Sequence, residues 1–302
     1  MSFIIFASPK SGTTWLQRLI SRHPAALCAE SRPFGDYYAA TSATGPHLTM
    51  DRFCGILSDY FAPSVPELKQ EDMPFRRALA HNFLDTLAAS ALAASKKLVY
   101  GEKFTPYRGT ALRAIAALEE YHPKIKFVNL TRDGRDVIAS GAAHWLNLRL
   151  RKAKPEERPR FEEALRNHTI LQEDFDMFLD CWMDAVQAGL AACRRFPNYL
   201  RIRYEDFVQE PCGQTAKLFD FLGLKSSKAA VRGCVEATSF NQLSQGRKRG
   251  EEDLSSFFRK GIVGDWKNWF TSGQLASFEE TAGSFLAELG YPREKPGVCQ
   301  PV

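Results

Sequence analysis

The sequence predicts an α/β fold with a central, mostly parallel sheet flanked by helices. Two observations support this prediction. Short apolar runs typical of buried strands alternate with longer helical patterns, and the first run leads through a loop of small residues directly into a helix. This alternation favours parallel pairing, because each helix carries the chain back to the start of the next strand. We therefore expect buried strands at residues 3–7, 97–100, 126–130 and 199–203.

Helical patterns fill the chain between and after these runs. We expect helices at residues 15–20, 78–94, 110–121, 133–145 and 161–195, and a last helix after Thr271. Thr271 and Gln274 have the spacing of a capping box, and Gly290 with Pro292 ends that helix. Prolines make residues 36–75 irregular, and the charged residues 149–160 predict a surface loop that could lie over the site as a lid. Residues 1–302 are expected to form a single domain.

Composition limits the class of protein. A chain of 302 residues with 44% hydrophobic and 25% charged residues is typical of a globular protein with a full core. The net charge of +5 suits anionic ligands, but no long basic run indicates a nucleic-acid partner. Seven scattered cysteines without a CxxC pair favour free thiols in a reducing compartment. The first apolar run is too short for a membrane anchor, so we expect a cytoplasmic protein without membrane insertion.

The loop between the first strand and the first helix has the features of an anion site. Backbone N–H groups and the positive end of the helix dipole point at a ligand in this position. Lys10 adds a mobile charge, Ser11, Thr13 and Thr14 add hydroxyl donors, and Gly12 lets the backbone approach closely. A strand–turn–helix without a ligand is the alternative. A Walker loop places its lysine after the second glycine, whereas Lys10 precedes the glycine, which argues against an ordinary kinase or ATPase.

Two motifs carry a resemblance to a known family. Residues 9–15, Pro-Lys-Ser-Gly-Thr-Thr-Trp, resemble the 5′-phosphosulfate loop of sulfotransferases that use 3′-phosphoadenosine 5′-phosphosulfate (PAPS). Residues 258–271 are similar, nearly residue for residue, to the RKGxxGDWK stretch of cytosolic sulfotransferases. Because the matches run in family order from residue 3 to residue 271, the chain is identified as a member of the PAPS-dependent sulfotransferases. The resemblance implies their P-loop-like fold, PAPS as the sulfuryl donor, and 3′-phosphoadenosine 5′-phosphate (PAP) as the product. We expect no metal, because a sulfuryl group carries less charge than a terminal phosphoryl group and the sequence has no metal-ligand cluster.

The resemblance also implies the residues that bind the donor. Lys10, Ser11, Gly12, Thr13 and Thr14 would hold the 5′-phosphosulfate, and Lys10 would stabilise the leaving oxygen. The 3′-phosphate would be bound by Arg132, Ser140, Arg259, Lys260 and Gly261, and the adenine by Trp15, Tyr204, Thr238 and Phe240. Taken one at a time, these residues could have a purely structural role. Arg132 could pair with Asp136 on a helix surface, and Tyr204 or Phe240 could belong to the core.

The general base is where the chain departs from the family pattern. Members that act on small phenols and steroids have a histidine in a Lys-Thr-His-Leu-Pro segment, where this chain has Gly-Glu-Lys-Phe-Thr-Pro at 101–106. Lys103 matches the family lysine, but Thr105 replaces the histidine. The segment is similar to that of heparan-type sulfotransferases, which implies Glu102 as the base, with Lys103 assisting on the sulfonate. Glu102 could instead simply pair with a cation, in which case His144 is the next candidate.

Aromatic residues and arginines bear on the acceptor, and a partial motif bears on the assembly. Aromatic residues favour a small lipophilic or aromatic alcohol, and the absence of a long basic groove favours a small molecule. These aromatic residues are Phe34, Tyr37, Tyr38, Phe53, Tyr60, Phe61 and Tyr107. Arg108, Arg149 and Arg151 would instead favour an anionic or saccharide acceptor. A non-enzymatic PAP- or PAPS-binding module is a further alternative, against which Lys10 and Glu102 argue. The family dimer motif is only partly present, because Ser272 and Ala276 replace its valine and glutamate, so the oligomeric state stays open.

Overall fold

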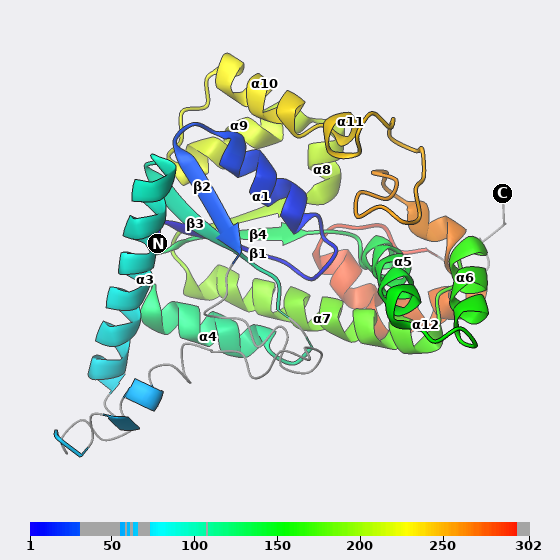
Figure 1. The fold of residues 1–302 in the computed structure, drawn as a ribbon, viewed down its shortest axis with the longest axis horizontal. Coiled ribbons are helices and arrows are strands. Elements are labelled where there is room, and N and C mark those ends of the chain that lie inside the picture. The colour runs from blue at the N-terminus through cyan, green and yellow to red at the C-terminus, as the bar shows by residue number, and fades with distance from the viewer. Residues whose placement is uncertain (31–54, 58, 61–62, 66–72, 107, 295–302) are drawn as a thin grey trace.

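A parallel five-stranded sheet forms the centre of the computed structural model, which describes residues 1–30, 55–57, 59–60, 63–65, 73–106 and 108–294. The strand order is β2-β3-β1-β4-β5, and every neighbouring pair is parallel. The strands are β1 (Phe3–Phe6), β2 (Ala26–Glu30), β3 (Val99–Phe104), β4 (Lys126–Thr131) and β5 (Tyr199–Arg203). Helices pack on both faces of this sheet (Figure 1), which confirms the predicted α/β class.

The sheet is covered differently on its two faces. Phe3 and Ile5 of β1 pack with α1 (Thr13–Arg22), α9 (Pro211–Leu222) and α10 (Lys228–Ala237) on one face. Ile4 and Phe6 pack on the opposite face with α3 (Met73–Ser95), α4 (Ala111–Tyr121) and α7 (Gln172–Arg195), and Figure 1 shows both groups of helices. Since side chains alternate along a strand, the continuous apolar run of β1 supplies both layers.

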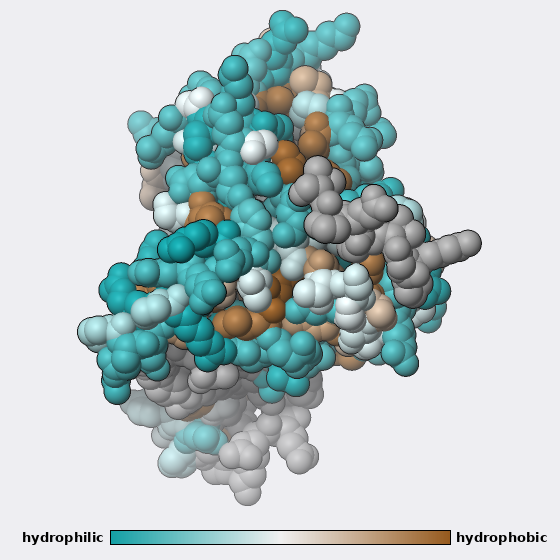
Figure 2. Space-filling view, turned by 90° about the vertical axis from the view of Figure 1, so that its right-hand side faces the viewer, coloured by the Kyte–Doolittle hydropathy of each residue, from teal (hydrophilic) through white to brown (hydrophobic). Residues whose placement is uncertain are grey.

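A second core lies beside the sheet and supports the helix that follows β4. It is built around the fully buried Trp182 of α7. The helices that surround it are α5 (Gly134–Lys152), α6 (Arg158–Arg166), η2 (Asp265–Asn268) and α12 (Ser272–Glu288). Two short helices, α8 (Tyr204–Gln209) and α11 (Phe240–Leu243), follow β5 and α10. Figure 2 shows that hydrophilic residues cover most of the face that it displays and that hydrophobic residues form only small patches there.

The region around Gly101 differs from the prediction. The predicted strand at 97–100 runs instead from Val99 to Phe104, so Gly101 does not end it and Glu102 and Lys103 are strand residues. A Cβ atom on Gly101 would lie 2.4 Å from the ring of Phe3. The glycine is therefore required by close packing between neighbouring strands rather than by a turn. The prediction also missed β2, a short strand at the edge of the sheet.

The segment predicted as a surface loop at 149–160 is largely helical. Helix α5 continues to Lys152 and α6 begins at Arg158. Arg149 holds the last turns of α5 in place because it donates two hydrogen bonds of 2.6 Å to the buried carboxylate of Asp174. The predicted helix at 161–195 is interrupted near His168, which has a positive φ of 51° and separates α6 from α7. Most of the predicted irregular segment at 36–75 lies outside the described residues.

The last helix agrees with the prediction. Thr271 and Gln274 form the reciprocal bonds of a capping box, and Gly290 follows the helix with a φ of 79°. The described cysteines, Cys28, Cys181, Cys193, Cys212 and Cys234, are free thiols. Among the described residues, no helix is both long and apolar enough to cross a membrane.

We predict that Gly101→Ala destabilises the protein by about 1–3 kcal/mol, because the added methyl group must displace the ring of Phe3 in a packed core. The free energy of unfolding in urea measures this change. Gly233→Ala is the matched control, since a Cβ atom at this helical position meets nothing within 4 Å. It should be neutral or stabilising. Equal stability of both variants would contradict the packing argument.

Candidate functional site

A cavity at the carboxyl ends of the strands brings together most of the predicted site residues. Loops that follow parallel strands meet at this edge of a sheet. The predicted residues that line the cavity are Lys10, Gly12, Thr13, Thr14, Trp15, Lys103, Arg132, Ser140, His144, Tyr204, Phe240, Arg259, Lys260 and Gly261. Ser11, Glu102 and Thr238 do not line it. Segments that are more than two hundred residues apart in sequence therefore converge on one site.

The loop after β1 has the geometry of an anion site. Gly12 precedes α1 with a φ of 91°, and a Cβ atom there would lie 2.7 Å from the ring of Tyr204, so both the conformation and the contact require glycine. No side chain caps the first N–H groups of α1. These groups are left available for an anionic ligand. Ser11 is buried and its hydroxyl lies 2.7 Å from that of Ser8, so it shapes the loop instead.

Lys10 is placed among other cations. Its backbone has a positive φ of 67°, an unusual conformation for a residue other than glycine. Burial of the ammonium group, together with the charges of Arg132, Arg259 and Lys103, lowers the pKa of Lys10 to about 7. Its Nζ atom lies 4.6 Å from the centre of the Phe257 ring. An anion in the cavity would stabilise the protonated ammonium and raise this pKa again.

Arg132 joins the loop after β4 to the loop after β1. Its Nη1 atom donates a hydrogen bond of 2.9 Å to the carbonyl of Lys10, and its guanidinium group lies 4.5 Å from the centre of the Tyr204 ring. The alternative pairing with Asp136 is only a 3.8 Å contact. Ser140 lies two turns along α5 and lines the same cavity. Arg132 is thus positioned by backbone and aromatic contacts.

Arg259 and Lys260 are both paired with Asp265. Arg259 lies 2.5 Å and Lys260 lies 2.8 Å from the carboxylate oxygens of Asp265, and Arg259 also pairs with Glu252. Burial tends to raise the pKa of Asp265, but Arg259 and Lys260 outweigh it and lower the pKa to about 2. Gly261 has a φ of 69°, and a Cβ atom there would lie 2.3 Å from the ring of Phe240.

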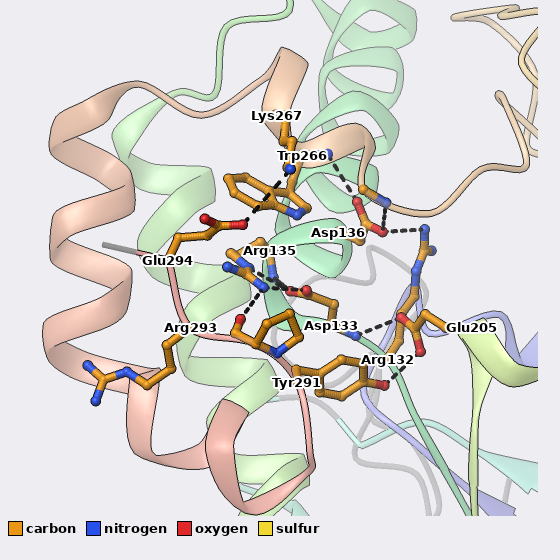
Figure 3. A network of polar contacts seen from close by, with 12 residues as sticks. Arg132, Asp133, Arg135, Asp136, Glu205, Trp266, Lys267, Tyr291, Arg293 and Glu294 are labelled. Carbon is orange, nitrogen blue, oxygen red and sulfur yellow. Dashed lines mark hydrogen bonds and ion pairs between the residues drawn. The ribbon is translucent and has the colours of Figure 1, made fainter. Parts of the chain in front are cut away.

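A carboxylate of α5 fixes the turn that follows these cations. Asp136 accepts hydrogen bonds from the N–H groups of Gly264, at 2.8 Å, and Trp266, at 3.0 Å (Figure 3). The N–H group of Asp133 donates in turn to Glu205, at 3.0 Å, and Glu205 accepts from the hydroxyl of Tyr291, at 2.7 Å. Because these acceptors are buried, each pairing is strongly specified. The network holds the loops after β4 and β5 and the turn before η2 in one arrangement.

Arg247, which the sequence analysis did not identify, organises the segment that carries Arg259. It donates to the carbonyls of Arg259 and Phe258, both at 2.7 Å, and of Glu251, at 3.1 Å. It also donates to the hydroxyl of Ser256, at 2.9 Å. One planar guanidinium group thus holds together parts of the loop that are separated in sequence, by donating hydrogen bonds to each of them. No sequence pattern marks Arg247, because its partners are mainly backbone carbonyls.

The aromatic end of the cavity is built around Trp15. Its Nε1 atom donates to the carbonyl of Thr238, at 3.0 Å, and its ring meets that of Tyr204 edge to face at 6.1 Å. Thr238 is buried, and its own hydroxyl donates to the carbonyl of Cys234, at 2.8 Å. Thr238 therefore orients Trp15 without lining the cavity, whereas Phe240 lines it.

The two candidate bases lie in different surroundings. Glu102 is buried beside Tyr100, whose hydroxyl donates to it at 2.8 Å. Lys103, on the other side of the strand, lies 2.9 Å from Glu30 and 3.4 Å from the hydroxyl of Thr14. His144 does line the cavity, one turn beyond Ser140. Burial, with the charges of Lys10 and Arg151, lowers the pKa of His144 to about 4, so its imidazole is neutral near pH 7.

We predict that Arg247→Ala weakens binding of PAP at least tenfold, because the loop that carries Arg259 loses its internal support. Arg247→Lys should recover little, since one ammonium group cannot reach all the acceptors. Isothermal titration calorimetry measures the affinity, and thermal unfolding shows whether the fold is retained. Arg232→Ala, on an exposed face of α10, is the control. Unchanged affinity in Arg247→Ala would contradict this role.

Comparison with known proteins identifies the family. A model of the sulfotransferase domain matches residues 2–101 and 114–290. Sulfotransferase 2A1 of Rattus norvegicus is 29% identical over 186 residues, which cover 57% of this chain and 60% of that protein. Sulfotransferase 2A1 of Homo sapiens is 28% identical over 182 residues, with coverages of 58% and 60%. The chain thus matches about 60% of the length of these curated relatives.

A solved structure agrees in fold. Mouse sulfotransferase SULT7A1, determined in complex with PAP, matches 94% of this chain and 83% of its own with a TM-score of 0.55 and 18% identity. This likeness confirms the predicted fold, and the domain match covers most of the sequence. The protein belongs to the sulfotransferase domain family.

Proposed function

We propose that the protein transfers the sulfuryl group of PAPS to a hydroxyl group of a small acceptor molecule. The observation that carries the proposal is the convergence, in one cavity, of the segments expected to bind the 5′-phosphosulfate, the 3′-phosphate and the adenine. The PAP complex of mouse SULT7A1, which shares the fold, supports the same class of donor. A saccharide acceptor, or a module that binds PAP without turnover, is the alternative.

The negatively charged groups of PAPS would each meet positively charged residues of the cavity. The 5′-phosphosulfate would accept hydrogen bonds from the start of α1 and meet Lys10. The 3′-phosphate would be bound by Arg132, Ser140, Arg259 and Lys260, of which the last two would exchange Asp265 for the phosphate. The adenine would stack near Trp15, where each base–aromatic contact is worth about 1–3 kcal/mol.

The reaction would be an in-line displacement at sulfur. The acceptor oxygen forms a bond to sulfur while the bond between sulfur and the phosphate oxygen breaks, and PAP leaves. The protonated Lys10 would stabilise the charge that develops on the leaving oxygen. The acceptor hydroxyl must lose its proton to a base within reach.

We propose His144 as the group that accepts this proton, because it lines the cavity that Lys10 also lines. The ring is neutral near pH 7 and can therefore accept a proton. The negative charge of the bound donor would raise its pKa towards a useful range. Glu102 remains the base that the resemblance implies, but its carboxylate is buried beside Tyr100 and does not line the cavity.

Several expectations from the sequence remain predictions. These are the single domain over residues 1–302, a cytoplasmic location, transfer without a metal, and the preference for a small acceptor over a saccharide.

We predict that His144→Ala lowers kcat/KM for sulfuryl transfer by about 10²–10⁴-fold, the usual contribution of a general base, while PAP still binds. Glu102→Gln should retain most of the activity. Transfer of labelled sulfate from PAPS to a panel of phenols and alcohols measures both. A reversed outcome, with Glu102→Gln inactive and His144→Ala active, would assign the base to Glu102.

We predict that PAP affinity falls as the pH is raised above about 7, because the ammonium group of Lys10, whose pKa is about 7 without ligand, must then take up a proton on binding. Below this pH the ammonium group is already charged before PAP binds, so Lys10 makes its full contribution to PAP affinity. The second ionisation of a phosphate group has a pKa of about 6 and is about nine-tenths complete at pH 7, so the window from pH 7 to 9 reports mainly on the lysine. Lys10→Arg, which stays charged throughout, should abolish the slope, and a slope that persists in this variant would contradict the assignment.

A further inference from the structure

A second pocket adjoins the donor cavity and shares part of its wall. Lys10, Ser140, His144, Phe257 and Arg259 line both. A molecule in the second pocket would therefore have one end beside Lys10 and His144, the groups that the proposed reaction uses. Its position is that of an acceptor, and its lining should indicate which acceptors fit.

One face of α5 runs along this pocket. Ser140, His144, Leu148 and Arg151 all line it, and their spacing places them on one side of the helix. His144 and Arg151 are seven residues apart, which corresponds to about 10 Å along a helix axis. The helix thus presents the imidazole at the inner end of the pocket and a guanidinium group two turns farther out.

The second pocket is lined by both positively charged and apolar side chains. Lys10, Arg151 and Arg259 line it, whereas its lining includes no aspartate or glutamate from the described part of the chain. Leu148 and Leu254 contribute apolar surface. A ligand that satisfies both parts has a hydrophobic body and a negatively charged group.

Arg151 is the arginine left available for such a group. The sequence offered three arginines as possible contacts for an anionic acceptor. Arg149 is bound to the buried Asp174 and Arg108 lies 2.7 Å from Asp180. The guanidinium group of Arg151, by contrast, forms no hydrogen bond or ion pair with another described residue. Two of the three arginines are thus occupied by partners in the fold, and the third lines the pocket.

We propose that the acceptor is an amphipathic hydroxyl compound with an acidic group, such as a carboxylate, that Arg151 binds about two helical turns, or about 10 Å, from the reacting hydroxyl. This inference rests on the proposed function. It makes Arg151 a specificity-determining residue that discriminates between acceptors without taking part in the chemistry.

The experiment compares an acidic phenol with its uncharged analogue. The probes are 3-(4-hydroxyphenyl)propionate and the corresponding amide, added to protein saturated with PAP, with binding measured by calorimetry at low salt. The same pair is then assayed for sulfuryl transfer from PAPS. Arg151→Ala and Arg151→Glu are compared with Lys152→Ala, which removes the adjacent charge of the same helix but does not line either pocket.

We expect wild type to bind the acid about fivefold more tightly than the amide, the size of an ion pair at a partly exposed site. Arg151→Ala should abolish the preference, Arg151→Glu should reverse it, and Lys152→Ala should keep it. Equal binding of acid and amide by wild type, or a preference that survives Arg151→Glu, would overturn the inference. If the preference follows Arg151 but neither these phenols nor any member of the panel of phenols and alcohols is sulfated, the pocket assignment holds and the proposed transfer reaction fails.

Discussion

The gathering of positive charge at one edge of the sheet is the constraint on which the rest of the structure depends. Lys10, Lys103, Arg132, Arg259 and Lys260 line one cavity, and like charges at this distance in a partly buried site repel each other strongly. Burial of the ammonium group, and after it the charges of Arg132, Arg259 and Lys103, lower the pKa of Lys10. Within the fold, Asp265, Glu252 and Glu30 supply part of the opposing charge through ion pairs with Arg259, Lys260 and Lys103.

The loops that carry these cations are held by side chains that bind backbone groups. Arg132 binds the carbonyl of Lys10, Asp136 binds the N–H groups of Gly264 and Trp266, and Arg247 binds carbonyls of its own loop. Such contacts fix the path of the chain whatever the neighbouring side chain is. These contacts hold the loops of the cavity through their backbones, and charge that is held in place is what a group-transfer reaction requires.

The sequence predicted the fold class because it depends on local signals. Strand β5 matches its predicted range, Tyr199–Arg203, and the loop around Gly12 joins β1 to α1 as expected, while its binding of the donor stays a prediction. The sequence did not predict the end of β3, because Gly101 resembles a turn residue until the ring of Phe3 is seen against it.

The sequence also did not show which way side chains point, and this limited the prediction of the site. Glu102 and Lys103 are adjacent in sequence, but neighbouring residues of a strand point to opposite faces of a sheet, and only Lys103 lines the cavity. The contacts of Arg247 and the availability of Arg151 are likewise long-range properties. They follow from which partners the fold brings near, and no spacing in the sequence encodes them.

A crystal structure of the protein with PAP tests the central claim most directly. The account predicts that the 3′-phosphate lies between Arg132, Arg259 and Lys260, with the last two released from Asp265, and that the 5′-phosphate lies at the start of α1 beside Lys10. A nucleotide bound elsewhere, or a 3′-phosphate that leaves the pairs with Asp265 intact, would contradict it.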